Sequence, residues 1–194
     1  MKTRLIFKKD FKQISNIWKK SLNDDVFSIL GEKIILLYLE LFIKDKKNFG
    51  FVIEKNRKIL AFLLYGKNEK IIKGIIKKQF FYIILKPFLL LKDFKMKEIV
   101  IFFEVMIFFV LSRFKNILDD IDTELLYICV KKNKIGLGLG KKIIKDSFKI
   151  KKIFFKNNVI KVKTLKKTSK NILFYKKLKF KIKKIFFGRV FLVI

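Results

Sequence analysis

Residues 123–148 read TELLYICVKKNKIGLGLGKKIIKDSF, and this stretch predicts a strand, a glycine loop and a helix in succession. The run from Leu125 to Val130 is apolar and rich in β-favouring residues, as expected of a strand buried on both faces. From Leu139 to Phe148 the apolar residues keep helical spacing, with lysines between them. Between these parts, three of the chain's eight glycines fall at positions 136, 138 and 140. This clustering indicates a backbone that something must approach closely.

Such a turn is suited to binding an anion. The first amides of a helix have no intrahelical partner, the helix dipole adds partial positive charge, and glycines let a phosphate come near. A Walker A loop is excluded, because Ile135 stands at its first glycine and Lys142 at its final Ser or Thr. A Rossmann fingerprint is excluded because its third glycine would fall on Lys141. A third pattern, V-x-P-x-x-R-G-x-G-x-G, matches residues 130–140 in length and in all three glycines. A tight turn without a ligand remains the alternative for this motif alone.

The composition predicts one folded domain over residues 1–194, because 52% of the 194 residues are apolar. The net charge of +31 fits a nucleic acid or an anionic membrane as partner. However, the chain has one proline, no histidine and lysines scattered throughout, which favours a compositional bias over a nucleic-acid role. The single cysteine, Cys129, excludes an internal disulfide, and the lack of histidine excludes His/Cys metal sites and His-based triads.

The chain shows no targeting or membrane-spanning pattern. Residues 1–8 lack the apolar core of a signal peptide, so a cytoplasmic protein is expected. Helices are predicted over residues 26–43, 71–85 and 95–118, and the last two form a very apolar segment. Its longest run, residues 99–111, is shorter than the roughly 20 residues of a spanning helix and contains Glu104. Peripheral contact with a membrane surface stays open.

Two further stretches carry a resemblance. Residues 171–180, NILFYKKLKF, resemble the pattern A-x-x-x-Y-E-K-L-G-F, and residues 26–38 resemble S-F-x-x-x-L-G-x-x-F-L-x-x-L-Y. Together with the glycine loop, these motifs resemble the GNAT family of N-acetyltransferases over nearly the whole chain. The match is to a subgroup with a helical insertion before the central strand, here residues 67–118. The resemblance implies an α+β fold of the acyl-CoA N-acyltransferase type. Its mixed, mostly antiparallel sheet has about seven strands, with helices on both faces.

The same resemblance implies an enzyme that transfers acetyl from acetyl-CoA to a primary amine of a small molecule, an amino sugar or a protein. Tyr175 matches the tyrosine that protonates the departing thiolate, and Glu124 matches a carboxylate that serves as base, directly or through water. A core role for Tyr175 and a surface role for Glu124 remain the alternatives. No metal is implied. The implied acetyl-CoA contacts with the pantetheine arm are Ile128, Cys129 and Val130. Those with the pyrophosphate are the amides of Gly136, Leu137, Gly138, Leu139, Gly140 and Lys141, and Thr168 is a further contact with the cofactor.

Four positions depart from the family pattern. Ile135 replaces the arginine or glutamine at the head of the loop, Lys132 a proline, Thr168 an asparagine and Lys179 a glycine. These departures leave open a second hypothesis, a catalytically degenerate basic module that binds an anionic membrane or nucleic acid. A cluster of acids before the central strand predicts instead a mouth that attracts a cationic amine; it comprises Asp119, Asp120, Asp122 and Glu124.

Overall fold

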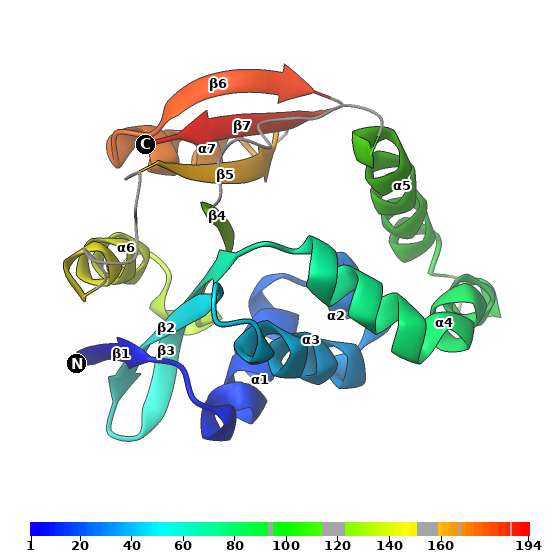
Figure 1. Cartoon of the computed structure of the whole chain (residues 1–194), viewed down its shortest axis with the longest axis horizontal. Helices are drawn as coiled ribbons and strands as arrows, with labels where there is room; N and C mark the ends of the chain where they lie inside the picture. The colour runs from blue at the N-terminus through cyan, green and yellow to red at the C-terminus, as the bar shows by residue number, and fades with distance from the viewer. Residues whose placement is uncertain (93–94, 114–122, 151–158, 167, 187) are drawn as a thin grey trace.

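Seven strands form one mixed sheet in the order β1-β2-β3-β4-β5-β7-β6. The structure is a computed structural model that describes residues 1–92, 95–113, 123–150, 159–166, 168–186 and 188–194 (Figure 1). The central pair, β4 and β5, runs parallel, and every other neighbouring pair is antiparallel. This arrangement confirms the predicted fold class.

The part of the chain that the structure describes contains seven strands and seven α-helices. The strands are β1 (Lys2–Leu5), β2 (Phe49–Lys55), β3 (Lys58–Gly66), β4 (Thr123–Val130), β5 (Ile160–Leu165), β6 (Lys181–Phe186) and β7 (Arg189–Val193). The helices are α1 (Phe11–Ser21), α2 (Val26–Leu30), α3 (Glu32–Lys44), α4 (Glu69–Lys92), α5 (Met96–Arg113), α6 (Leu139–Ile150) and α7 (Ser169–Lys177). Two short 3₁₀ turns, η1 (Lys8–Asp10) and η2 (Lys132–Lys134), precede α1 and the glycine loop.

Each face of the sheet buries a separate apolar layer. Helices α1, α2 and α3 cover one face, and their apolar side chains pack against those of β3 and β4. Helices α6 and α7 cover the other face, where Ile143, Ile144 and Tyr175 meet side chains of β2, β3, β5 and β7. The sheet therefore has helices on both faces, and its central strand β4 contributes to both layers.

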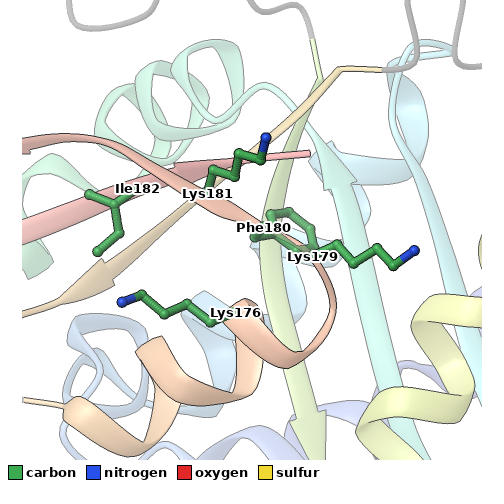
Figure 2. A pocket seen from close by; sticks show the side chains of 5 residues that line it. All are labelled: Lys176, Lys179, Phe180, Lys181 and Ile182. Atoms are coloured by element: carbon green, nitrogen blue, oxygen red, sulfur yellow. The ribbon is translucent and has the colours of Figure 1, made fainter.

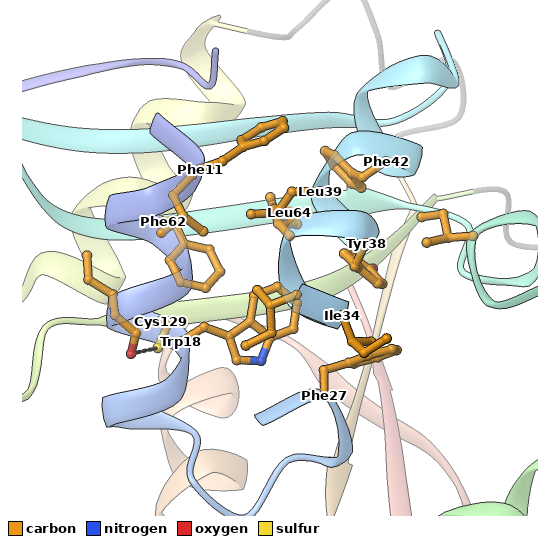
Figure 3. Close-up of a cluster of buried hydrophobic side chains, with 14 of the residues drawn as sticks. Phe11, Trp18, Phe27, Ile34, Tyr38, Leu39, Phe42, Phe62, Leu64 and Cys129 are labelled. Atoms are coloured by element: carbon orange, nitrogen blue, oxygen red, sulfur yellow. Dashed lines mark hydrogen bonds between the residues drawn. The ribbon is translucent and has the colours of Figure 1, made fainter. Parts of the chain in front are cut away.

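Trp18 is the centre of the layer under α1 (Figure 3). Its fully buried ring lies 4.1 Å from the ring of Tyr127, 5.4 Å from that of Tyr38 and 5.6 Å from that of Phe62, measured between centroids. Burying an indole removes roughly 200 Å² of apolar surface from water, about 5 kcal/mol as an upper estimate. The Trp18 side chain of α1 thus joins helix α3 and strands β3 and β4, which lie far apart in sequence.

Two helix predictions were wrong at their boundaries. The stretch predicted as one helix over 26–43 is two helices, because Gly31 between them adopts a φ of 100°. That left-handed value interrupts helical hydrogen bonding and suits only glycine without strain. The helix predicted over 71–85 does not end before Pro87, since α4 continues through Pro87 to Lys92; it is kinked instead at Gln79, with φ −133° and ψ 27°. Helices α4 and α5 nevertheless lie between β3 and β4.

Candidate active site

The two parallel strands at the centre of the sheet stay paired over three residues only. Their register runs Thr123 to Ile160, Glu124 to Lys161 and Leu125 to Val162, and the described residues show no later pair between them. Strand β5 goes on to pair with β7 through Leu165, whereas β4 stays with β3 through Val130. Beyond Leu125, the backbone of β4 thus turns an edge without a strand partner toward β5. An edge of this kind presents N–H and C=O groups to which an extended chain can hydrogen-bond.

A β-bulge lies at the same point of β4. Leu64 pairs with Tyr127 and Tyr65 with Leu125, so Leu126 is the extra residue. Because the bulge breaks the alternation, Leu126 and Tyr127 both face the layer under α1–α3. Downstream, Cys129 faces that same layer, while Ile128 and Val130 face α6 and α7. Bulges bend a strand and increase its twist, which accounts for the parting of β4 from β5.

The glycine loop follows directly and leads into α6. Gly136 and Gly138 have φ values of 88° and 72°, and a Cβ added at either would meet nothing within 4 Å. Backbone conformation rather than crowding therefore requires glycine at both positions. The first helical hydrogen bond runs from the amide of Lys142 to the carbonyl of Gly138 at 2.9 Å. The amides of residues 139–141 come before that bond and lie at the positive end of the helix dipole.

Gly140 brings the loop against two other elements of the site. A Cβ at this position would stand 3.3 Å from Cζ of Phe174 on α7 and 3.8 Å from Cδ1 of Ile128 on β4. Glycine is thus needed here for close approach. The start of α6, the part of β4 beyond its pairing with β5, and helix α7 consequently meet at one place.

Tyr175 lies in the layer under α6 and α7, with 6% of its surface exposed. Its ring contacts those of Phe174 and Phe180 at centroid distances of 5.2 and 5.5 Å, and it lies close enough to Tyr65 to influence the charge on that phenol. Tyr65 pairs in register with Leu125, where β4 and β5 part. Burial raises the pKa of Tyr175 well above its ordinary value of 10.0, so the hydroxyl keeps its proton at neutral pH.

Glu124 lies on the opposite face of the sheet from Tyr175. Its carboxylate is 3.8 Å from Nζ of Lys161 and 3.6 Å from Nζ of Lys163, both on β5. Its charge also reaches the hydroxyls of Tyr38 and Tyr127 in the layer under α1–α3. The two residues predicted as acid and base are therefore held on either side of the point where the strands part. The other members of the predicted acidic mouth, Asp119, Asp120 and Asp122, lie outside the described residues.

Two predicted cofactor contacts already have partners within the chain. The Thr168 hydroxyl donates to the carbonyl oxygen of Leu165 at 2.7 Å and lies 3.2 Å from the hydroxyl of Thr164, so toward a ligand it can only accept. The Cys129 side chain is 4% exposed and points away from α6, with its sulfur 3.9 Å from the carbonyl oxygen of Ile17 (Figure 3). Burial raises the pKa of this thiol to about 12. The Cys129 backbone pairs in register with Phe62 of β3.

Asp25 is a residue of this region that the sequence interpretation missed. Its carboxylate accepts hydrogen bonds from Nε1 of Trp18 at 2.9 Å and from the amide of Phe27 at 3.1 Å, at the N-terminus of α2. Burial raises its pKa to about 6, although hydrogen bonds from Trp18, the backbone and Tyr127 act in the opposite direction. An aspartate just before an apolar helical run is a recognisable N-cap signal. Its link to Tyr127 on β4 is a long-range contact with no local signal.

A basic cavity of about 550 Å³ lies at the turn from α7 to β6, lined by Lys176, Lys179, Phe180, Lys181 and Ile182 (Figure 2). None of the predicted site residues lines it. Within the described ranges, no three His, Cys, Asp or Glu side chains are placed to hold a metal ion. In the same ranges, none of the helices has the length and apolar content needed to cross a membrane.

Known proteins resemble the chain in structure rather than in sequence. No family profile matches the sequence, and no curated protein matches it. The ribosomal-protein-alanine N-acetyltransferase from Brucella melitensis matches 100% of this chain and 99% of its own, with a TM-score of 0.61 and 12% identity. An acetyltransferase from Thermus thermophilus gives a TM-score of 0.60 at 11% identity, covering 100% of this chain and 97% of its own. The paiA N-acetyltransferase from Thermoplasma acidophilum, solved in complex with coenzyme A, gives 0.56 at 12% identity, covering 100% and 98%. At these identities the likeness establishes the acyl-CoA N-acyltransferase fold.

Proposed function

We propose that the chain is an N-acetyltransferase of the GNAT type, which takes acetyl from acetyl-CoA and transfers it to a primary amine of a small molecule, an amino sugar or a protein. The observation that carries this proposal is the parting of β4 and β5 after Leu125, with the glycine loop and Tyr175 at the same place. Structural neighbours named as N-acetyltransferases, one of them with coenzyme A bound, support it.

The chain has groups that fit the two halves of the donor. The edge of β4 over residues 128–130 would pair with the amides of the pantetheine arm, where the Val130 carbonyl already accepts a hydrogen bond from the Ser21 hydroxyl at 3.0 Å. The amides at 136–141 would hold the pyrophosphate. The exposed φ-positive glycines leave space around those amides. Acetyl-CoA itself supplies an acetyl group activated as a thioester.

Tyr175 and Glu124 would act on the leaving sulfur and on the amine's proton, respectively, from opposite sides of the point where β4 and β5 part. With a pKa raised by burial, Tyr175 gives up its proton less readily than a free phenol, whereas a thiol has an ordinary pKa of about 8.5. We therefore assign the Tyr175 hydroxyl to donating a hydrogen bond toward the leaving sulfur rather than to full ionisation. Glu124 would accept the amine's proton from the face covered by α1–α3, directly or through water.

The surroundings of Glu124 bear on the acceptor. The ammonium groups of Lys161 and Lys163, within 4 Å of the carboxylate, repel a second cation there. The amine must therefore arrive neutral or lose its proton as it binds. The turnover of a suitable amine is expected to rise with pH toward the amine's own pKa.

The proposal is tested by measuring amine-dependent release of coenzyme A thiol from acetyl-CoA over a panel of amines, amino sugars and peptides. Tyr175→Phe should lower turnover by about 10²-fold or more while coenzyme A still binds. Tyr65→Phe is the matched control, because it removes another buried phenol on the same face, whose hydroxyl lies 3.0 Å from that of Ser147. It should leave turnover within about threefold of the wild type. Coenzyme A binding without thiol release for any amine would favour the degenerate, non-catalytic alternative.

A further inference from the structure

The second half of α4 and the start of α5 expose an extensive apolar surface. These two helices provide half of the exposed large hydrophobic side chains in the part of the chain that the structure describes. Phe81 is 79% exposed and Phe88 is 65% exposed, values unusual for phenylalanine in a monomer. We call this set the α4–α5 apolar surface; its members are Phe80, Phe81, Ile84, Leu85, Phe88, Leu89, Leu91, Met96, Val100, Phe103 and Ile107.

The surface is a continuous stripe on each helix. On α4, Phe81, Leu85 and Phe88 follow one another at intervals of four and three residues, and α5 repeats that spacing from Met96 to Ile107. The same helices bury other apolar residues against the protein, among them Leu90 and Ile99. The exposed stripe is therefore additional to the side that packs on the core. Figure 1 shows both helices at one side of the molecule, beyond α2 and α3.

Lysines outnumber acids around this surface, chiefly along α4. Residues 69–107 contain eight lysines and four acidic residues, Glu69, Asp93, Glu98 and Glu104. Lys77 and Lys78 are exposed one turn before Phe81, and Lys92 is exposed at the other end of α4. An apolar stripe bordered by cationic side chains is the pattern of helices that lie in the interface of an anionic bilayer.

We propose that the α4–α5 apolar surface docks the protein onto an anionic lipid membrane, with the two helices in the plane of the interface and the lysines among the headgroups. Charge decides between the possible occupants. A second copy would bring the same lysines together in a chain of net charge +31, whereas anionic headgroups neutralise them. A nucleic acid would satisfy the lysines and its bases could stack on the phenylalanines, but the aliphatic side chains that make up most of the surface would stay in water. This inference does not depend on the proposed acetyl transfer.

The test is co-sedimentation of the full chain with vesicles of phosphatidylcholine alone or with about 30% phosphatidylglycerol. Phe81→Glu combined with Phe88→Glu removes the two most exposed aromatics, and Ile182→Glu with Ile185→Glu places the same charges on exposed positions of β6, 42% and 53% exposed. Thermal unfolding of every variant is the control that checks whether it folds. In a second measurement, Phe81→Trp is mixed with vesicles of brominated acyl chains, where quenching reports insertion, because the native Trp18 is fully buried.

The wild type should bind the anionic vesicles and not the neutral ones. The α4 double variant should lose at least about tenfold in partitioning, and the β6 double variant should lose less than about threefold. Equal losses in the two double variants would show adsorption by general charge and overturn the proposal. So would unquenched emission from Phe81→Trp. Self-association by sedimentation velocity, lost in the α4 variant and unaffected by lipid, would assign the surface to a second copy instead.

Discussion

The glycine loop allows a sharp test because the chain contains a second glycine in the same conformation outside this loop, at the turn between β6 and β7. Gly138 and Gly188 have φ values of 72° and 67°, and at both a Cβ would meet nothing within 4 Å. Gly138→Glu and Gly188→Glu therefore impose the same backbone strain and add the same charge. Each should cost about 1–2 kcal/mol of folding free energy and lower the melting temperature by about 2–8 °C.

Coenzyme A binding should separate the two variants. A carboxylate about 6 Å from a phosphate charge costs about 3 kcal/mol at an effective dielectric constant of 20, roughly a hundredfold in Kd. Salt at about 0.15 M screens an exposed loop, so we expect a loss of at least about tenfold for Gly138→Glu in titration calorimetry. Gly188→Glu should bind like the wild type. If Gly138→Glu binds coenzyme A as tightly as Gly188→Glu, the loop does not hold the pyrophosphate.

The buried Asp10 and the half-buried Asp25 give opposite pH dependences of stability. Arg4 binds Asp10 at 2.7 and 2.9 Å and Glu54 at 2.6 Å, and Arg4→Met should cost about 2 kcal/mol at neutral pH. Burial raises the pKa of Asp10, but the hydrogen bonds from Arg4 and the Phe7 amide outweigh it, so the net shift is downward. That stability exists above about pH 4 and disappears as pH falls through the folded-state pKa; the wild-type advantage in urea unfolding should shrink toward about pH 3. A pH-independent gap would contradict this. For Asp25, burial raises the pKa to about 6, so the folded chain binds this proton more tightly than the unfolded chain. The wild type should lose about 2–3 kcal/mol relative to Asp25→Asn between about pH 4 and pH 7, and a constant difference over that range would refute the assignment.

The sequence predicts best where local pattern and global fold agree. The buried strand at 125–130, the glycine loop and the amphipathic α6 all appear where the pattern places them. The hairpin between β2 and β3 is equally local, since Asn56 and Arg57 take the positive φ values that a tight turn requires. Such elements depend on neighbours in sequence, which a single chain displays.

The unpredicted features depend on partners far along the chain. Glu124 has its two lysines because β4 and β5 pair in parallel, a register that no local pattern reveals. The bulge at Leu126 reverses which side chains face each layer, so simple alternation misplaces Tyr127. Helix α4 continues through Pro87, although a proline favours a break in a helix. In each case tertiary packing overrides the local preference.

The charge of +31 is best understood by comparing lysines with the apolar residues beside them. A compositional bias toward lysine, isoleucine and phenylalanine places lysines on every solvated face, so scattered charge alone identifies no partner. The same bias does not explain why exposed apolar residues gather on two adjoining helices. Exposure of a large apolar side chain is unfavourable at each position independently, so such residues are normally scattered singly over a surface. Elsewhere in the described ranges the exposed ones occur at one or two per element, such as Ile43 on α3 or Ile182 and Ile185 on β6. The gathering on α4 and α5 is therefore the feature on which the proposed membrane contact of the surrounding lysines rests, because acyl chains cover aliphatic side chains that water and nucleic acid leave exposed.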